Sequence, residues 1–406
     1  MRISTNQLFD RSIQHILDNQ GDLSDIQRQL ATGKKILRPS DDPVGAAQVM
    51  RLTEELERID QYKTNNTLLK NSLTQEEAIL QSVTDSVLRA RQLTVQAGSG
   101  INDDQDRQAL GVEIGQIRDQ VFDLMNARNA DGEYIFAGNQ SDSPAFIFDP
   151  NAVGNHYIFQ GDTGQNKMQL SNTVTVASGD SGFGVFENVL ARLDADITGG
   201  TAASSLRITQ QGAFDTFHQN NYDAVAPANN VYTGTINGVT NQIDFINAGT
   251  LLPAGSASFV SGEPFTFNGM EMTVTGVAGE TVEFTLQQPE KKNLAQTLDD
   301  LFVALNDSNI SDGAYVEAID NALIGIDNGF DSVSNANAAI GGRLNVAESI
   351  EQSNLDLEIA NKEARSEIED VDYAEAVSEL SKQETSLQAA QATFSRVTQL
   401  SLFDFI

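Results

Sequence analysis

Residues 40–97 read SDDPVGAAQVMRLTEELERIDQYKTNNTLLKNSLTQEEAILQSVTDSVLRARQLTVQA. From residue 46 to residue 97 the stretch contains neither glycine nor proline, the two residues that most disfavour a helix interior. Its start offers capping oxygens and a proline suited to the first helical position, at Ser40, Asp41, Asp42 and Pro43. The stretch therefore predicts one long helix that begins near Pro43.

Working outward, helical spacing recurs on both sides of this stretch. Apolar residues return every three or four positions in residues 110–124 and 316–333. Asp103 and its acidic neighbours stand where the first of these helices would begin, a place where negative charge is favourable. Residues 343–406 again lack glycine and proline. Together these segments predict a long antiparallel helical rod.

Both ends of the chain carry an apolar stripe at helical spacing. The stripe residues are Phe9, Ile13, Ile16, Leu23, Ile26 and Leu30 at one end, and Tyr373, Val377, Leu380, Leu387, Ala390, Phe394 and Val397 at the other. Such stripes suit helices that pack as a coiled coil. We expect the two terminal helices to pair, and the stripes to pack within the pair and between subunits.

The middle of the chain has a different composition. Residues 131–290 hold 19 of the 31 glycines and 6 of the 8 prolines. Asn237-Gly238 and Asn268-Gly269 each lie between alternating apolar positions, which predicts two hairpins with two-residue turns, and residues 281–286 alternate again. The predicted fold is therefore mainly α, with an inserted β domain.

These patterns predict three domains. Residues 1–44 and 362–406 would form a terminal coiled-coil domain. Residues 45–199 and 289–361 would form the rod with a β-hairpin, and residues 200–288 an outer β domain. The ends of an inserted domain must lie close together, and an antiparallel helical frame places them so.

Charge and composition exclude several classes of function. The chain has 57 acidic and 25 basic residues, a formal net charge of −32, which argues against nucleic acid or an anionic membrane as a partner. It has no cysteine and three scattered histidines, so neither a metal site nor a cofactor is expected. No apolar run reaches membrane-spanning length, and the amino terminus lacks the apolar core of a secretory signal. A cytoplasmic protein, or one exported by a route without such a signal, would fit.

No motif in the chain predicts catalysis. Residues 179–183, GDSGF, are similar to the nucleophile loop of trypsin-like proteases, but no histidine stands at a suitable place upstream. A glycine-rich turn explains these residues more simply. Two carboxylates acting on a glycosidic bond stay an alternative that no motif supports. We expect a protein that is not an enzyme.

Three segments resemble the bacterial flagellin family. They are QLATGKKILRPSDDPVGAAQ at residues 29–48, GEYIFAGNQSDSPAF at 132–146, and SEIEDVDYAEAVSELSKQETSLQAAQATFSRVTQLSLFDFI at 366–406. Flagellins themselves typically read RLSSGLRINSAKDDAAG where this chain reads RQLATGKKILRPSDDPVG, so the match is closer to the junction proteins of that family. The resemblance covers residues 1–146 and 310–406 and is weak across 150–290.

The resemblance implies a structural adaptor between the flagellar hook and the flagellin filament. The implied partners are the first hook-associated protein, flagellin, and further copies of the chain in a ring at the hook tip. A cytoplasmic export chaperone would hold the carboxy-terminal helix. The implied location is extracellular, reached without a cleavable signal peptide. Alternatives are a flagellin-type filament subunit and, more remotely, a secreted hydrolase or adhesin on an export scaffold.

The resemblance also gives two short motifs a role. Residues 40–43 would be a family motif as well as a helix cap. Gly132, Tyr134, Phe136, Gly138 and Asn139 would form a hairpin that braces the rod. Since burial of two stripes falls short of the entropy cost of ordering both arms, we further expect the terminal arms to be disordered in the free monomer and to fold on assembly.

Overall fold

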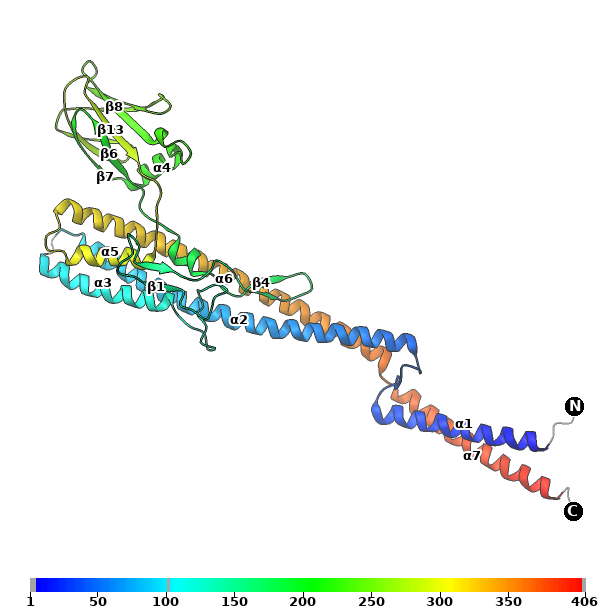
Figure 1. Cartoon of the computed structure of the whole chain (residues 1–406). Coiled ribbons are helices and arrows are strands. Elements are labelled where there is room, and N and C mark those ends of the chain that lie inside the picture. Colours follow the sequence, from blue (N-terminus) through cyan, green and yellow to red (C-terminus); the bar gives the residue numbers. More distant parts are fainter. Residues whose placement is uncertain (1–4, 101–102, 404–406) are drawn as a thin grey trace. The chain divides into compact units, whose positions relative to one another are not determined.

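The computed structural model of the chain describes residues 5–100 and 103–403 (Figure 1). Its long helices are α1 (Thr5–Thr32), α2 (Pro43–Ala97), α3 (Asp104–Met125), α5 (Leu294–Asn306), α6 (Asp312–Glu369) and α7 (Tyr373–Phe403). A sheet-rich domain is inserted between α3 and α5 along the chain. The predicted fold class, helical with an inserted β domain, is confirmed. The chain divides into two compact units.

One unit comprises residues 1–70, 168–176 and 345–406. Within its described part, α1 packs along α7, and the first part of α2 lies beside the end of α6, where Lys70 forms an ion pair with Glu351 (Figure 1). The Asn66 side-chain amide donates a hydrogen bond of 2.8 Å to the Ala347 carbonyl, which joins α2 to α6. Leu69 of α2 is fully buried beside this contact. The unit is therefore built almost entirely by helix-on-helix packing.

The other unit comprises residues 71–167 and 177–344. Within it, α5 lies against two helices at places where each carries glycines four residues apart: Gly111 and Gly115 on α3, and Gly325 and Gly329 on α6. A Cβ atom on Gly329 would lie 2.5 Å from Cδ1 of Leu294, and one on Gly115 would lie 3.0 Å from the ring of Phe302. Side chains of α5 thus rest directly on the backbones of α3 and α6. α5 was not predicted from the sequence.

Short antiparallel pairs follow α3 along the chain. They are β1 (Phe146–Phe148) with β2 (Tyr157–Phe159), β3 (Lys167–Gln169) with β4 (Thr175–Ala177), and β5 (Val189–Leu190) with β14 (Lys291–Lys292). A single π-helical turn, Phe183–Glu187, lies between β4 and β5. The β5–β14 pair joins the two chain segments that lead into and out of the inserted domain, since Leu190 pairs with Lys291.

The inserted domain is a pair of sheets around one core. A five-stranded sheet has the order β10 (Pro253–Ser258), β9 (Gln242–Asn247), β8 (Val231–Asn237), β13 (Thr281–Leu286), β6 (Ala195–Gly200). A three-stranded sheet has the order β11 (Pro264–Phe267), β12 (Met270–Thr275), β7 (Ala203–Ile208). Buried side chains of both sheets and of α4 (Gln211–Asn221) form a single hydrophobic cluster, in which Phe245 and Phe267 stack at 4.2 Å between ring centroids.

The two Asn-Gly pairs differ in outcome. Asn268 and Gly269 have φ of 48° and 84° and form a two-residue turn between paired Phe267 and Met270, which confirms that prediction. The prediction of a two-residue turn at Asn237-Gly238 is wrong. Asn237 pairs with Gln242, so the loop between the two strands has four residues. The Asn237 side-chain oxygen accepts hydrogen bonds from two backbone amides of the loop, at 3.0 and 3.4 Å, so Asn237 opens the turn instead of occupying its centre.

Candidate assembly sites

The paired terminal helices carry most of the predicted assembly residues. On α1, the side chains of Ile13, Ile16, Leu23, Ile26 and Leu30 are partly buried against α7. On α7, Leu380, Leu387, Ala390 and Phe394 are partly buried as well. Of the stripe residues whose side chains the structure describes, none is fully buried. The pair of helices alone leaves part of each stripe uncovered.

Two predicted residues on α7 are mostly exposed. Tyr373 is 58% exposed and Val377 is 52% exposed, whereas Ala376 is 7% exposed. The partly or fully buried line on α7 runs through Ala376, Leu380, Gln383, Leu387, Ala390 and Phe394, with steps of four and three. Sequence reasoning missed Ala376 because it began the line at Tyr373 and continued to Val377, and it missed Gln383 because that side chain is polar. The side chains of Phe9 and Val397 lie outside the described residues.

A short crossing of the chain, which we call the joint (residues 33–38 and 369–372), links the end of α1 to the start of α7. The Lys35 amide donates a hydrogen bond of 2.6 Å to the Glu369 carbonyl, and the Val371 amide donates one of 3.0 Å to the Gly33 carbonyl. Lys34 pairs with Asp370 as an isolated β-bridge, and its ammonium group forms an ion pair with Glu369. The joint was not predicted. A glycine directly after the α1 stripe, a common helix C-terminal residue, was the available signal.

The residues of the cap motif have different roles. The Asp42 carboxylate accepts hydrogen bonds from the amides of Val44 and Gly45, at 3.1 and 3.0 Å, so Asp42 caps α2 and Pro43 is its first residue. The Asp41 carboxylate instead accepts from the Leu37 and Arg38 amides in the preceding loop, at 3.2 and 2.8 Å. The Ser40 hydroxyl donates a hydrogen bond of 3.4 Å to the Asp41 carboxylate.

The GEYIFAGN segment forms tight turns with one isolated β-bridge, between Arg128 and Tyr134, and so departs from the regular hairpin that was expected. The regular hairpin nearby is the β1–β2 pair. Gly132 and Gly138 have positive φ, and Phe136 is fully buried.

Gly138 has a steric requirement as well. A Cβ atom there would lie 2.2 Å from the Asp162 carbonyl oxygen. The Asn139 amide donates a hydrogen bond of 3.1 Å to the Asp162 carboxylate, which holds this turn against the loop that follows β2.

A buried carboxylate of α2 was also missed by sequence reasoning. Glu76 is fully buried; one of its oxygens accepts a hydrogen bond of 3.0 Å from the Asp180 amide, and the other has no hydrogen-bond partner. Asp180 is bound through both oxygens by the Arg343 guanidinium of α6, at 2.6 and 3.0 Å. Burial, and secondly the Asp180 charge, raise the pKa of Glu76 to about 8. Glu76 thus ties the 178–181 turn to α2 as a carboxylic acid near neutral pH.

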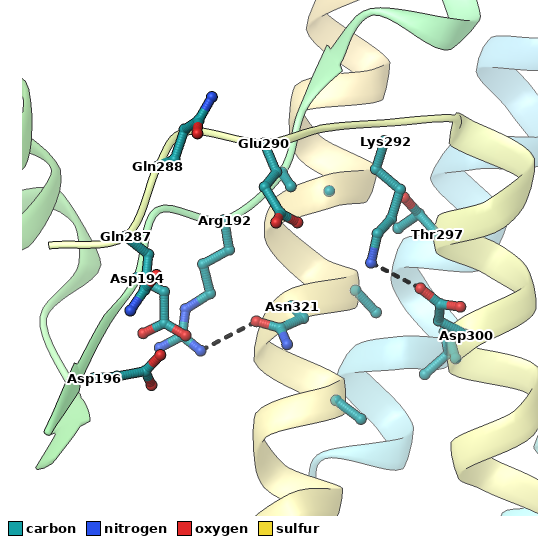
Figure 2. A pocket seen from close by; sticks show the side chains of 15 residues that line it. Arg192, Asp194, Asp196, Gln287, Gln288, Glu290, Lys292, Thr297, Asp300 and Asn321 are labelled. Atoms are coloured by element: carbon teal, nitrogen blue, oxygen red, sulfur yellow. Dashed lines mark hydrogen bonds and ion pairs between the residues drawn. The ribbon is translucent and has the colours of Figure 1, made fainter. Parts of the chain in front are cut away.

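The base of the inserted domain contains a polar pocket of about 360 Å3 (Figure 2). Figure 2 shows the Arg192 side chain directed toward Asn321, to which it donates a hydrogen bond of 3.2 Å, and Lys292 bound to Asp300 at 2.8 Å. Burial raises the pKa of Asp194 in its wall. The cationic groups of the pocket are bound to its own side chains, so its geometry fits a connection between β strands and α6.

The remaining candidates for chemistry find structural roles. The Ser181 hydroxyl of GDSGF donates a hydrogen bond of 2.7 Å to the Asp162 carbonyl, and Asp180 is engaged by Arg343. Within residues 5–100 and 103–403, no group of three or more histidine, aspartate or glutamate side chains is placed to hold a metal ion. No helix among the described residues combines the length and the apolar character needed to cross a bilayer.

Comparison with known proteins finds the flagellin helical regions at both ends of the chain. The model of the bacterial flagellin N-terminal helical region matches residues 3–141, and that of the C-terminal helical region matches residues 323–406, which together exceed half of the chain. Flagellin of Listeria monocytogenes is 29% identical over 32% of this chain and 46% of its own length.

Similarity over the whole chain is found with another member. Flagellar hook-associated protein 3 of Escherichia coli K12 is 24% identical over 99% of this chain and 99% of its own length. The crystal structure of flagellar hook-associated protein 3 from Legionella pneumophila aligns with a TM-score of 0.59 and 23% identity, over 79% of this chain and 99% of that chain. With its paired terminal helices, its helical rod and matches at both ends, this chain belongs to the bacterial flagellin family, and within it is similar end to end to flagellar hook-associated protein 3.

Proposed function

We propose that this protein is a structural subunit of the bacterial flagellum that connects the hook to the flagellin filament. The observation that carries the proposal is the end-to-end similarity to flagellar hook-associated protein 3, whereas the flagellin of Listeria monocytogenes aligns over about a third of the chain. The protein acts without catalysis: the Ser181 hydroxyl is bound to a backbone carbonyl, and in the polar pocket Lys292 is bound to Asp300 and Arg192 to Asn321.

The proposed partners follow from this position. One face of a ring of copies meets the first hook-associated protein at the hook tip, and the other meets the first flagellin subunits. Before export, a cytoplasmic chaperone holds α7. The protein then works outside the cell, at the hook–filament junction, and reaches it without a cleavable signal peptide. The net charge of −32 supports partners other than nucleic acid or an anionic membrane.

The terminal helices form the assembly domain in this proposal. Residues 1–44 and 362–406 are its terminal coiled coil, residues 45–199 and 289–361 its rod, and residues 200–288 its outer domain. β6 extends that outer domain back to Ala195, five residues before the boundary expected from the sequence. The partial burial of the stripes supports the further proposal that the arms order only when neighbouring subunits cover the rest of each stripe. Tyr373 and Val377, exposed beside the stripe, then face such a neighbour.

Deletion of the gene in its own bacterium, followed by electron microscopy of the cells, tests the proposal. The expected result is hooks without filaments, with flagellin released into the medium and filaments restored by the full-length gene. Abundance distinguishes this function from the alternative, a flagellin-type filament subunit. A junction protein is present at about one ring per filament, whereas a flagellin forms the bulk of the filament. Intact filaments on the deletion strain would reject the junction function.

A further inference from the structure

The joint differs from the terminal helices in how completely it is bonded. Two backbone hydrogen bonds cross it, from Lys35 to Glu369 and from Val371 to Gly33, and the Lys34–Glu369 ion pair lies beside them. Glu369 is also approached by Arg365, at 3.9 Å. The stripe residues of α1 and α7 are only partly buried, and between the two helices the Asn19 side-chain amide donates a hydrogen bond of 3.3 Å to the Ser386 hydroxyl.

The joint also supplies one end of each terminal helix. Gly33, with φ of 72°, ends α1 in the left-handed conformation, and its amide donates a hydrogen bond of 2.8 Å to the Gln29 carbonyl. On the other chain segment, the Asp372 carboxylate accepts hydrogen bonds from the Ala374 and Glu375 amides, at 2.8 and 3.2 Å, and so caps the start of α7. The last turn of α1 and the first turn of α7 are therefore both defined at the joint.

The loop from the joint to α2 is held in place as well. A Cβ atom on Gly45 would lie 2.8 Å from Cδ1 of Ile36, so the Ile36 side chain rests on the first turn of α2. Asp41 holds the Leu37 and Arg38 amides, and Asp42 caps α2. The joint is thus fixed to α2, whose residues Ile59 and Leu69 are buried.

Helix formation is limited by its nucleus. The first turn fixes several residues for a single hydrogen bond, whereas each later residue adds one bond, so a helix grows readily once one turn exists. A place that already holds a capped turn of each terminal helix, and holds the two turns beside each other, removes this barrier. It also sets the register in which the two stripes meet, since Gly33 lies opposite Val371.

We propose that the joint stays formed in the free subunit and nucleates the terminal helices, which then grow from it toward the two chain ends as neighbouring subunits cover their stripes. This inference rests on the proposed folding of the arms during assembly. It adds a direction to that folding: α1 forms from Thr32 toward its start, and α7 forms from Tyr373 toward its end.

Amide hydrogen exchange on the free, full-length subunit tests the proposal. The Lys35 and Val371 amides are expected to be protected, and protection should fall along α1 from residue 30 to residue 13 and along α7 from residue 376 to residue 394. Weak protection at the joint together with weak protection in the arms would overturn the proposal that the joint nucleates the helices. It would remain consistent with arms that fold on assembly. Arms as strongly protected as the joint would overturn assembly-coupled folding, and the nucleus with it.

A matched pair of variants makes the test specific. Lys35→Pro removes the amide that donates to Glu369, whereas Lys35→Ala keeps that amide and removes only the side chain. In Lys35→Pro, protection of residues 26–32 and 373–380 should fall about five- to tenfold, the effect of one lost backbone hydrogen bond. In Lys35→Ala, protection of the same residues should stay within about twofold of the wild type, since the Lys35 side chain takes part in none of the bonds across the joint. Amides around Leu69 must remain protected in both variants, which shows that α2 is folded. Equal effects of the two substitutions would overturn the proposal.

Discussion

At the scale of single residues, Glu76 has the most perturbed environment described above. It is a fully buried acid with one oxygen bound to the Asp180 amide and the other without a partner, close to the Asp180–Arg343 ion pair. Burial favours its neutral form, and its pKa is raised to about 8. Because the pKa is higher in the folded chain than in the unfolded chain, Glu76 contributes stability that is present in full below pH 4.5. That contribution is lost as the pH rises toward 8.

Glu76→Gln should therefore stabilise the protein at alkaline pH. Glutamine keeps the hydrogen bond to the Asp180 amide and has no charge to bury, and each unit of pKa corresponds to about 1.4 kcal/mol. The difference in the free energy of unfolding between the variant and the wild type should grow in favour of the variant between about pH 5 and pH 9. Urea unfolding at several pH values measures it. Glu77→Gln, at an exposed position one residue along α2, is the control and should show no such trend.

At the scale of elements, α1 and α7 contact each other along one line of side chains on each helix. Ile16 and Leu387 lie on the partly buried lines of the two helices, whereas Leu17, the next residue on α1, is 55% exposed. An aspartate on a buried line must lose water without gaining a partner, which costs several kcal/mol at full burial and less here.

Ile16→Asp or Leu387→Asp should abolish assembly and leave the rod and the inserted domain folded. Leu17→Asp tests whether the effect belongs to the stripe, and it should retain most of the assembly. Restoration of filaments in the deletion strain reports assembly, and thermal melting followed by circular dichroism reports folding. A large fall of the melting temperature in Ile16→Asp would contradict the separation, because it would place this residue in the core of the free subunit.

At the scale of the whole molecule, the inserted domain is attached through one small ladder. β5 and β14 pair through Leu190 and Lys291. The chain therefore enters and leaves the domain at two residues that lie opposite each other in this ladder. Beyond the ladder, side-chain contacts between the domain and α6 include Arg192 with Asn321 and the Arg207–Asp320 ion pair at 3.5 Å. Exposed contacts of this kind contribute about 0–1 kcal/mol each.

Replacement of residues 191–290 by Asn-Gly should therefore leave the helices folded. The dipeptide suits a two-residue turn between β5 and β14. We expect the melting temperature of the helical part to change by only a few degrees, about the effect of 1 kcal/mol in a chain of this size. Loss of cooperative melting would show that the inserted domain is needed for the helices to fold.

The sequence predicted what depends on local patterns. The start of α2 at Pro43, the helical periodicity of α3 and α6, and the Asn268-Gly269 turn are set by residues close together in the chain. α5 was missed although its own residues predict it: Leu294, Leu298, Leu301 and Leu305 recur at helical spacing and are buried, and the Asn293 side chain caps the helix. What could not be read from residues 294–306 is the contact of α5 with the glycines of α3 and α6, because those residues lie far away in the sequence.

The same limit applies to the assembly sites. The stripe of α1 was readable from its large apolar residues, but on α7 the line begins at Ala376, whose small side chain carries little apolar signal. In the joint, the Val371 amide is hydrogen-bonded to the Gly33 carbonyl, although most of the sequence lies between these two residues. Its existence could not be read from either segment alone, because each looks like an ordinary loop between two helices.

The four glycines around α5 have a consequence for how this chain can vary in evolution. Gly111, Gly115, Gly325 and Gly329 leave no room for a side chain against α5. A methyl group at Gly329 alone would meet Leu294 at 2.5 Å, so a mutation at one of these sites requires a smaller residue on α5 in the same lineage. Exposed positions of the inserted domain face no such restriction. Substitutions should therefore accumulate quickly in the outer domain and slowly, in correlated pairs, where α5 meets its two neighbours.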